Sequence, residues 1–570
     1  MSQDNQPATG SSENEQIKHA SNFLRGTIRQ GLRDALTGGI APSDQQISKF
    51  HGMYQQDDRD VRLERQQQKL EPLYNFMVRV RMPGGVCRPS QYLVLDRLAR
   101  EHGGGSLRLT TRQTFQFHGI AKRDLRATVQ ALHATLLDTI AACGDVNRNV
   151  MCNPNPSLSS LHGEVYGWAK RLSEQLLPRS RAYHEIWLND ELVAGGEPPL
   201  EEEPLYGRCY LPRKFKIAMA IPPENDVDVF ANDLGFIAIA ESGKLLGFDV
   251  TVGGGMGMTH SEPTTYPRTA DVIGFCTPDE VLAIAQAVVS AQRDLGDRRD
   301  RKLARLKYTI DRLGLDAFVS ELERRLGHKL APARRFFFDG TGDRYGWVED
   351  EGGLWHYTLF VENGRIRDQD GVQLLTALRE IASVHDGDLR MTANQNLTIA
   401  SVSTADRPRI DALLAKFGLK EGPKRSGLRL HALACVALPT CGQAMAEAER
   451  YLPSLLDRLD QIEREAGIAD APIIVRMTGC PNGCARPYLA EIGLVGKNLG
   501  KYNVYLGGAA DGSRLGKLYR ESQTDDEIVA ALAPLFHRYA TERTPGERFG
   551  DFVIRAGIVA ATRHGKDFHA

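Results

Sequence analysis

The stretch SLRLTTRQTF, residues 106–115, recurs 282 residues later as DLRMTANQNL, residues 388–397. A second pair follows in the same order: FIAIAESGKLLGFDVTVGGG, residues 236–255, resembles EIGLVGKNLGKYNVYLGG, residues 491–508. Two similar pairs in the same order indicate an internal duplication. We therefore predict a pseudo-twofold axis, with a functional site built from both halves at the seam.

The hydrophobic pattern around these segments predicts an α+β fold. Strand patterns occupy residues 74–82, 106–118, 214–221, 236–252, 355–361, 388–400, 472–478 and 491–507. Helical patterns occupy residues 123–142, 279–296, 405–417 and 441–467. The two classes alternate along the chain in both halves.

Composition excludes several classes of protein. The chain of 570 residues is too long for one compact core. Its 71 basic and 72 acidic residues nearly cancel, which argues against a protein that covers nucleic acid or an anionic membrane. Nine cysteines are too sparse for a disulfide scaffold. The polar start is no signal peptide, and no run of about 18 apolar residues predicts a membrane span. We expect a cytoplasmic protein.

The strand pattern at 107–118 places polar side chains on one face and apolar side chains on the other. The polar face carries Arg108, Thr110, Arg112, Thr114, Gln116 and His118, and it contains no acid. Such a face is either solvated or a platform for an anionic ligand, because guanidinium groups match carboxylates and phosphates. Residues 76–82 likewise place Arg79 and Arg81 on one face.

Further cations stand in two short motifs. Arg148 lies in VNRNVMC, and Arg213, Lys214 and Lys216 lie in YLPRKFKIAMAIPP. A chain with a net charge of -1 thus concentrates positive charge in a few places. This pattern favours a small polyanion over a nucleic-acid polymer as the partner.

Four of the nine cysteines form a set with the spacing C-x5-C and then C-x3-C: Cys435, Cys441, Cys480 and Cys484. Four thiols in one domain suggest an iron–sulfur cluster, with structural zinc as the alternative. The predicted helix at 441–467 would put Cys441 near a helix N-terminus, and Pro481 to Gly483 predict a tight turn. The remaining cysteines are predicted to be small buried hydrophobes: Cys87, Cys143, Cys152, Cys209 and Cys276.

The motif TGCPNGCARP together with C-x5-C resembles the signature of the siroheme and 4Fe-4S sulfite and nitrite reductase family, and RLTTRQTFQFHG, VNRNVMC and LPRKFK resemble its first-half motifs. The resemblance runs from about residue 17 to the C-terminal region. It implies two ferredoxin-like half-domains that pair with each other and two α/β cofactor-binding domains around the pseudo-twofold axis. The expected boundaries are an N-terminal arm at 1–70, half-domains at 71–150 and 331–420, and cofactor domains at 151–330 and 421–570.

The resemblance also implies a role for each candidate residue. Cys435, Cys441, Cys480 and Cys484 would hold the 4Fe-4S cluster, and the Cys484 thiolate would bridge to the siroheme iron, with Asn482 beside it. The siroheme carboxylates would be bound by Arg108, Thr110, Arg112, Gln116 and His118. The substrate pocket would consist of Arg79, Arg148, Lys214 and Lys216, with Arg81 as the alternative to Arg79.

By the same resemblance, the reaction is the six-electron reduction of sulfite to sulfide in assimilatory sulfate reduction and cysteine biosynthesis. Lys216 favours sulfite, since relatives that prefer nitrite tend to have Asn there. GGGMG at 253–257 does not lead into a helix, so it fails as a dinucleotide motif. A separate flavoprotein subunit with FAD and FMN would therefore take electrons from NADPH.

Two questions stay open at the level of sequence. Residues 1–16 are predicted to be disordered, and residues 17–70 are either a solvated tail or an arm that docks the flavoprotein. The alternatives to the NADPH-fed enzyme are a ferredoxin-dependent sulfite or nitrite reductase of the same family and a zinc-clamped scaffold without enzymatic activity.

Overall fold

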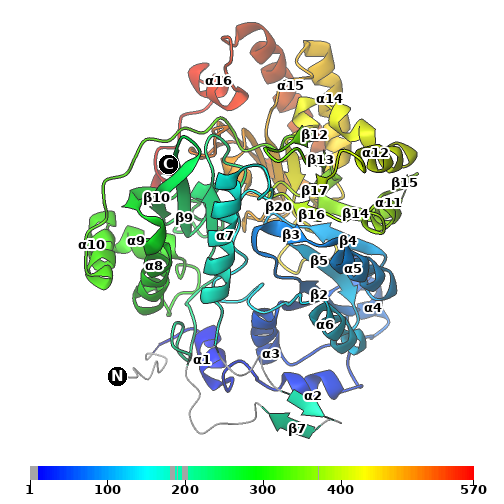
Figure 1. The fold of residues 1–570 in the computed structure, drawn as a ribbon, viewed down its shortest axis with the longest axis vertical. Coiled ribbons are helices and arrows are strands. Elements are labelled where there is room, and N and C mark those ends of the chain that lie inside the picture. Colours follow the sequence, from blue (N-terminus) through cyan, green and yellow to red (C-terminus); the bar gives the residue numbers. More distant parts are fainter. Residues whose placement is uncertain (1–9, 180–185, 189–190, 195–202, 370, 570) are drawn as a thin grey trace.

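Two antiparallel sheets from the repeated halves exchange a strand with each other (Figure 1). The structure is a computed structural model that describes residues 10–179, 186–188, 191–194, 203–369 and 371–569. In spatial order, the first sheet contains β1 (Met53–Asp57), β2 (Tyr74–Arg79), β5 (Phe115–Ile120), β4 (Ser106–Leu109), β14 (Arg365–Gln369) and β15 (Val372–Gln373). The second contains β12 (Gly346–Glu349), β13 (Trp355–Leu359), β17 (Leu397–Val402), β16 (Asp388–Met391) and β3 (Val86–Cys87).

The exchange is reciprocal. β14 of the second half pairs with β4 of the first, and β3 of the first half pairs with β16 of the second. Helices α5 (Pro89–Glu101), α6 (Leu125–Ala134), α11 (Leu374–Ala382) and α12 (Arg407–Lys416) accompany these sheets. One continuous hydrophobic cluster includes Phe76 and Leu107 from the first half and Leu359 and Leu414 from the second. The two halves therefore share a core.

Two further sheets repeat one topology. The first contains β8 (Ile217–Ala220), β9 (Leu234–Glu241), β10 (Lys244–Val252) and β11 (Asp271–Cys276). The second contains β18 (Ala432–Ala434), β19 (Val475–Thr478), β20 (Ile492–Asn498), β21 (Lys501–Leu506) and β22 (Lys517–Gln523). In each, a parallel pair, β8 with β9 or β19 with β20, is followed by two antiparallel strands. The duplicated α+β fold is thereby confirmed.

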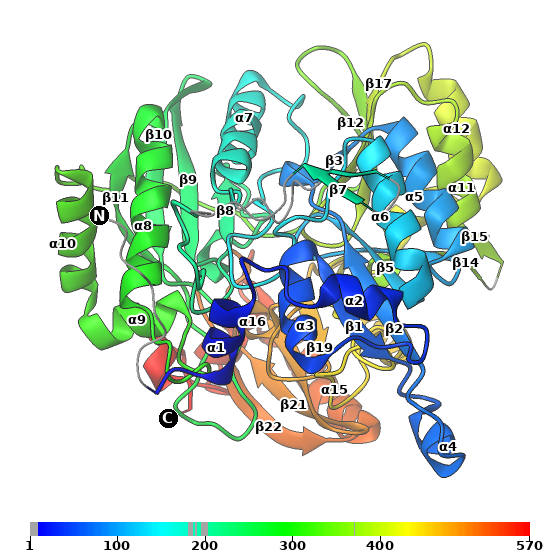
Figure 2. The ribbon, with the colours of Figure 1, turned by 90° about the horizontal axis from the view of Figure 1, so that it is seen from below.

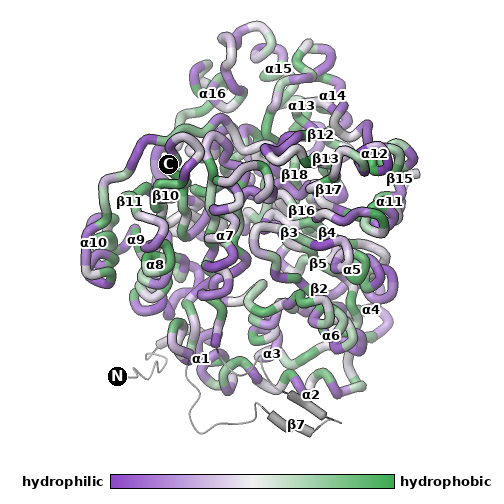
Figure 3. The backbone as a smooth tube through the Cα atoms, in the orientation of Figure 1, coloured by the Kyte–Doolittle hydropathy of each residue, from purple (hydrophilic) through white to green (hydrophobic). Residues whose placement is uncertain are grey.

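Helices cover these two sheets. The first has α7 (Ser160–Gln175), α8 (Val281–Leu295), α9 (Leu306–Leu313) and α10 (Leu315–Leu326); the second has α13 (Gly427–Leu430), α14 (Leu452–Ala466), α15 (Asp525–Glu542) and α16 (Phe549–Arg555). Figure 1 shows α8, α9 and α10 together on one side and α14, α15 and α16 at one end of the molecule. A small pair, β6 (Ile186–Leu188) and β7 (Glu191–Ala194), stands apart. Hydrophobic residues recur along α5 and α8 in Figure 3.

The N-terminal segment is built into the body, which corrects the expectation of a solvated tail. It forms α1 (Glu13–Ala20), α2 (Ile28–Arg33), α3 (Pro42–Ile47), β1 and α4 (Arg62–Gln67). Leu24, Ile47 and Phe50 belong to the hydrophobic cluster beneath β8 to β10. The predicted disorder of residues 1–16 is wrong for α1, and residues 1–9 lie outside the described residues. Figure 2 shows that α4 projects from this segment.

Three local predictions also need correction. The strand predicted at 106–118 is a hairpin, because Gln113 adopts a left-handed conformation with φ 53°, as does its counterpart Gln395 with φ 67°. The helix predicted at 441–467 begins only at Leu452, so Cys441 lies in a loop rather than at a helix N-terminus. The helix predicted at 123–142 ends at Ala134. Within the described residues, no helix is long and apolar enough to cross a membrane.

Candidate active site

Strand register brings the predicted cradle residues into one row. Arg79 of β2 pairs with Gln116 of β5, and Gln116 pairs with Arg108 of β4. Arg365 of the exchanged strand β14 extends the row beside Arg108. With its amide turned so that the oxygen faces Arg79, the Gln116 side chain accepts a hydrogen bond of 2.6 Å from Arg79 Nε. Burial, and then the charges of Arg365, Arg108 and Arg79, hold the pKa of His118 well below its usual value.

The hairpin tip carries the next two predicted residues. Thr110 is buried, and its hydroxyl accepts a hydrogen bond from the Arg112 backbone N–H at 3.2 Å. The Arg112 guanidinium donates to Asn232 Oδ1 at 2.6 Å, while its buried Nε has no partner. Burial, followed by the charges of Arg486 and Arg148, lowers the pKa of Arg112 to about 9. An unpartnered buried donor is costly, so this group is suited to a ligand anion.

The predicted substrate residues surround Arg148. Burial, and then the charges of Arg213, Arg148 and Arg305, lower the pKa of Lys214 to about 7. The pKa of Lys216 is also held well below its usual value, by burial and then by Lys214. Cations that depress one another in this way lie close together and favour an anion between them.

Arg79 belongs to this pocket and Arg81 does not. The Arg79 guanidinium donates to Cys143 Sγ at 2.9 Å, at the loop that also carries Arg148. Arg81 instead donates to Ser173 Oγ at 2.6 Å and lies 3.4 Å from Asp138. Of the two arginines that the sequence offered as candidate substrate ligands, the position of Arg79 therefore fits better.

The cysteine loops lie beside these cations. Gly479 N–H donates to Cys435 Sγ at 3.4 Å, and Asn482 Nδ2 donates to Cys480 Sγ at 3.5 Å. Gly483 has φ 62°, which agrees with the tight turn predicted between Cys480 and Cys484. The charge of Cys484 acts on Lys214 and raises its pKa, against the larger effect of burial. The cysteine loops and the anion pocket therefore adjoin.

The thiols fit a cluster better than a single ion. After the larger effect of burial, the charge of Cys484 raises the pKa of Cys435, Cys441 and Cys480, so the four thiols lie near one another. Yet the described residues contain no group of three or more His, Cys, Asp or Glu side chains placed to hold one metal ion. A 4Fe-4S cube spaces its thiolates more widely than zinc does. Cys484 is the exposed member of the set, so its sulfur is accessible to a second ligand. The remaining five cysteines are buried, as predicted.

Register in the second pair of sheets aligns the two copies of this region. Ala218 pairs with Gly235 between β8 and β9, and Arg476 pairs with Gly493 between β19 and β20. Matching the two glycines places IPPENDVDVF, residues 221–230, on GCPNGCARPY, residues 479–488. Where the second copy has its cysteine loop, the first copy therefore has prolines and acids.

The aligned copies meet at a buried ion pair. Asp228 and Arg486 occupy equivalent positions, both in the left-handed region with φ 47° and 57°. The Arg486 Nε donates to Asp228, and Arg476 adds a second contact to Asp228 at 2.7 Å. Arg486 also donates to the carbonyls of Thr111 at 3.1 Å and Ala393 at 3.0 Å, one in each hairpin tip. Arg486 thus stands at the pseudo-twofold axis and holds both halves.

Only one copy carries the cations of the pocket. Met151, which bridges to Ala218, matches Leu433, which pairs with Arg476. Counting from these pairs and from the repeat, the second copy has Asn394, Leu430, Pro472 and Ile474 where the first has Arg112, Arg148, Lys214 and Lys216. The fold therefore forms without these cations, which indicates that they serve a ligand and not the architecture.

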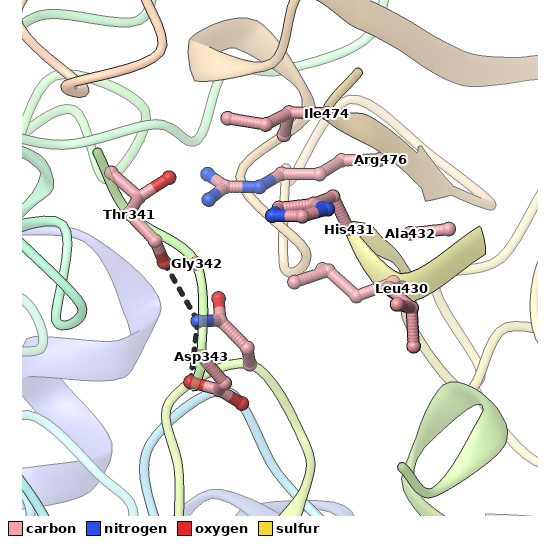
Figure 4. Close-up of a pocket in the computed structure, with 10 residues that line it drawn as sticks. Thr341, Gly342, Asp343, Leu430, His431, Ala432, Ile474 and Arg476 are labelled. Atoms are coloured by element: carbon pink, nitrogen blue, oxygen red, sulfur yellow. Dashed lines mark hydrogen bonds between the residues drawn. The ribbon is translucent and has the colours of Figure 1, made fainter. Parts of the chain in front are cut away.

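The second copy's pocket has little space. Figure 4 shows Leu430 and Ile474 beside Asp343, His431 and Arg476. The cavity has a volume of about 10 Å³, room for about one water molecule. A siroheme or an oxyanion cannot enter such a space.

Sequence reasoning missed several residues of the site. Arg305 forms a buried ion pair with Asp233 at 2.9 Å, and its charge lowers the pKa of both Lys214 and Lys216. A signal existed in GGGMG: a Cβ on Gly255 would lie 2.9 Å from the Arg305 guanidinium, so the glycine permits this approach. Glu449, which pairs with Arg108 and Arg365, carried no recognisable motif.

Comparisons with known proteins agree with this arrangement. The family model described as "Nitrite/Sulfite reductase ferredoxin-like half domain" matches residues 67–135 and 348–417. The model described as "Nitrite and sulphite reductase 4Fe-4S domain" matches residues 167–330, which is the copy without the cysteine loops.

Full-length relatives are also similar. The chain is 60% identical over 560 residues to a protein of Geobacillus kaustophilus named sulfite reductase (NADPH) hemoprotein beta-component, covering 98% of each chain. It is 58% identical over 563 residues to the protein of the same name from Bacillus subtilis, covering 99% of this chain and 98% of that one. Among solved structures, the NirA protein of Mycobacterium tuberculosis matches with a TM-score of 0.79 and 25% identity over 97% of this chain and 99% of that one.

Proposed function

This chain belongs to the nitrite and sulfite reductase family, and we propose that it reduces sulfite to sulfide with a siroheme and a 4Fe-4S cluster. The observation that carries the proposal is the cationic pocket beside Cys484, which the duplicated copy lacks. Its cations match an oxyanion with up to two negative charges. The name shared by the similar full-length relatives supports the same substrate.

We assign the cofactor ligands by position. Cys435, Cys441, Cys480 and Cys484 would hold the cluster, and Cys484 would be shared with the siroheme iron. The siroheme carboxylates would be bound by residues of the first sheet and the hairpin tip, namely Arg108, Thr110, Arg112, Gln116 and His118. When bound, the coupled pair supplies the electrons and an iron centre to which the sulfur of the substrate attaches.

The chain's own residues would bind the oxyanion and move protons. Arg148 is a fixed donor for a sulfite oxygen, and its guanidinium stays charged at working pH. A Lys214 pKa of about 7 allows the ammonium group to give up a proton near neutral pH, which suits a general acid for loss of oxygen as water. Lys216, depressed by the same neighbours, would serve as a second donor.

Two measurements test the proposal. The purified protein should show the strong visible absorption of siroheme, which zinc cannot give, and it should reduce sulfite with reduced methyl viologen as the electron donor. Its kcat/KM for sulfite should exceed that for nitrite. A protein without this absorption, or one that prefers nitrite, would refute the assignment.

We further propose that electrons come from NADPH through a flavoprotein partner that binds the N-terminal segment. Four leucines of this segment are exposed: Leu36, Leu63, Leu70 and Leu73. Glu71 lies between Leu70 and Leu73 in the sequence and accepts hydrogen bonds from Thr37 Oγ1 at 2.7 Å and Gly38 N–H at 2.8 Å. These bonds hold the chain next to Leu36 against the chain that carries Leu70 and Leu73. Exposed apolar groups that cluster in this way favour a protein contact.

The double variant Leu36→Ser/Leu73→Ser should lower turnover driven by NADPH and flavoprotein and leave turnover driven by methyl viologen unchanged. Leu499→Ser, at an exposed leucine in the β20–β21 turn, is the matched control. Deleting residues 1–60 would be a poor test, since it removes β1 and core residues such as Phe50. If reduced ferredoxin supports turnover and the flavoprotein does not, the enzyme is ferredoxin-dependent.

A further inference from the structure

The segment from Ser48 to Asp57 is fixed against the loop that carries Arg148. Ala141 N–H donates to the Phe50 carbonyl at 2.9 Å, and Thr139 Oγ1 donates to the His51 carbonyl at 2.7 Å. Gly52 has φ 79°, and a Cβ there would lie 2.4 Å from the Thr139 carbonyl oxygen, so a side chain at this position would break the contact. The segment is therefore held in place as a wall of the site.

Lys49 lies on this wall, within electrostatic range of the cations of the pocket. Its ammonium group donates to Gln46 Oε1 at 2.5 Å and lies 5.5 Å from the centroid of the Tyr54 ring. The charged groups that act on Lys49 are Asp145, Arg301, Arg213 and Arg148. Burial and the three arginines, opposed by Asp145, lower its pKa to about 8. Arg213 and Arg148 also act on Lys214, and Asp145 also acts on Arg148.

Tyr54 links Lys49 to the predicted substrate residues. Its hydroxyl interacts electrostatically with Arg148, and the ring lies under the Lys49 ammonium group. Burial raises the pKa of Tyr54, so the phenol stays neutral and the ring offers its face to the cation. The pair thus connects the N-terminal segment to the centre of the pocket.

The duplication gives an independent indication that Lys49 faces the pocket. Gly52 and Gly346 stand at equivalent places at the start of the edge strands β1 and β12, and both have φ 79°. Across each strand, the partner of Gly52 is Arg79 and the partner of Gly346 is Thr358.

Counting back three residues from each glycine gives Lys49 in the first copy and Asp343 in the second. Asp343 lines the small pocket of Figure 4, together with the residues that match Arg112, Arg148 and Lys216. The position of Lys49 is thus a pocket-lining position in both copies, and only the first copy places a cation there.

We propose that the N-terminal segment completes the oxyanion pocket: Lys49 binds a sulfite oxygen, and Tyr54 and Gln46 position its ammonium group. This inference rests on the proposed sulfite reduction. It adds a cation that no motif of the family resemblance contains, and it gives the N-terminal segment a role in the site that is separate from docking of the flavoprotein.

The test uses holoenzyme driven by reduced methyl viologen, so that the flavoprotein is not involved. Lys49→Met should raise the KM for sulfite about 10-fold, with a smaller change in kcat. The KM for nitrite should rise less, because nitrite carries one negative charge and sulfite up to two. Lys49→Arg should restore most of the sulfite affinity. Tyr54→Phe, which removes the hydroxyl that interacts with Arg148, should raise the sulfite KM by a smaller factor.

Controls separate binding from folding. Lys416→Met removes one charge from the exposed α12, where Lys416 pairs with Glu380, and should leave both KM values unchanged. The visible absorption and the thermal unfolding midpoint of Lys49→Met should match those of the wild type. A sulfite KM unchanged in Lys49→Met, or raised equally for sulfite and nitrite, would overturn this inference. Absence of sulfite reduction in the wild type would instead overturn the proposed function.

Discussion

Replacing Lys214 with methionine should destroy activity and at the same time stabilise the protein. Lys214 is half-buried among cations, and its pKa falls from 10.5 to about 7, first because of burial and then because of Arg213, Arg148 and Arg305. Methionine fills a similar volume without a charge. The variant therefore removes an ammonium group whose burial among other cations destabilises the folded state.

The magnitude follows from the pKa. Each unit corresponds to about 1.4 kcal/mol, so the full shift of Lys214 corresponds to at most about 5 kcal/mol. Water reaches a half-buried side chain and screens part of this cost, which leaves about 1–3 kcal/mol of expected stabilisation. Loss of a general acid should lower the kcat/KM for sulfite about 100-fold or more.

The sign of the pH dependence is fixed by the direction of the shift. Between pH 7 and 10.5 the unfolded chain binds a proton at Lys214 that the folded chain has lost, so wild-type stability rises with pH across this window. Lys214→Met removes that dependence. Its advantage over the wild type should be largest below pH 7 and should vanish above about pH 10.5.

The assay is thermal unfolding at several pH values, paired with sulfite turnover driven by methyl viologen. Lys416→Met serves as the control for loss of an exposed lysine charge, and it should change neither property. A lower unfolding temperature for Lys214→Met near pH 6.5, or full sulfite activity, would refute the account of Lys214 as a destabilising functional cation.

Three further outcomes are expected. Lys216→Ile installs the residue type of the second copy, so it should keep the visible absorption and lose at least about 100-fold in kcat/KM for sulfite; retained activity would contradict the assignment. Asp228→Asn leaves a buried guanidinium without its carboxylate and should lower the free energy of unfolding in urea by about 3–5 kcal/mol. Because Asp228 and Arg486 are equivalent positions, Asp228→Arg combined with Arg486→Asp should recover part of that loss, and no recovery would argue against the axis. Cys484→Ser should lose siroheme absorption, whereas Cys276→Ser should keep it.

The sequence was sufficient to predict the duplication and to single out candidate residues that the fold brings into one region. The repeat at 106–115 and 388–397 lies in matching hairpins, and the four cysteines lie on loops that meet the same pocket. These features were predictable because each one is a local pattern of residue types. The turn at Gln113 was not predicted, because a left-handed glutamine does not change the period-2 pattern of apolar and polar residues.

Long-range features were not predictable from local pattern. The exchange of β3 and β14 depends on which free sheet edge is closer, and that is decided only when both halves are folded. The N-terminal segment is rich in Gln and charge, which predicts solvation, yet its few apolar residues such as Phe50 enter a core built elsewhere. The helix expected at Cys441 failed because 442–451 form turns against the cysteine loop, with Met445 N–H bonded to the Gly479 carbonyl.

The duplication also explains why the pocket could accumulate so many unfavourable charges. The second copy shows that the same backbone is satisfied with Leu430 and Ile474, so Arg148 and Lys216 are not required for folding. In the first copy, each added cation lowers the pKa of the neighbouring lysines, which makes them stronger acids. The same cations together attract an anion more strongly. The shared core and the buried Asp228–Arg486 pair hold the two copies together. The stability of the whole chain can therefore offset the cost of the cations that are concentrated in one pocket.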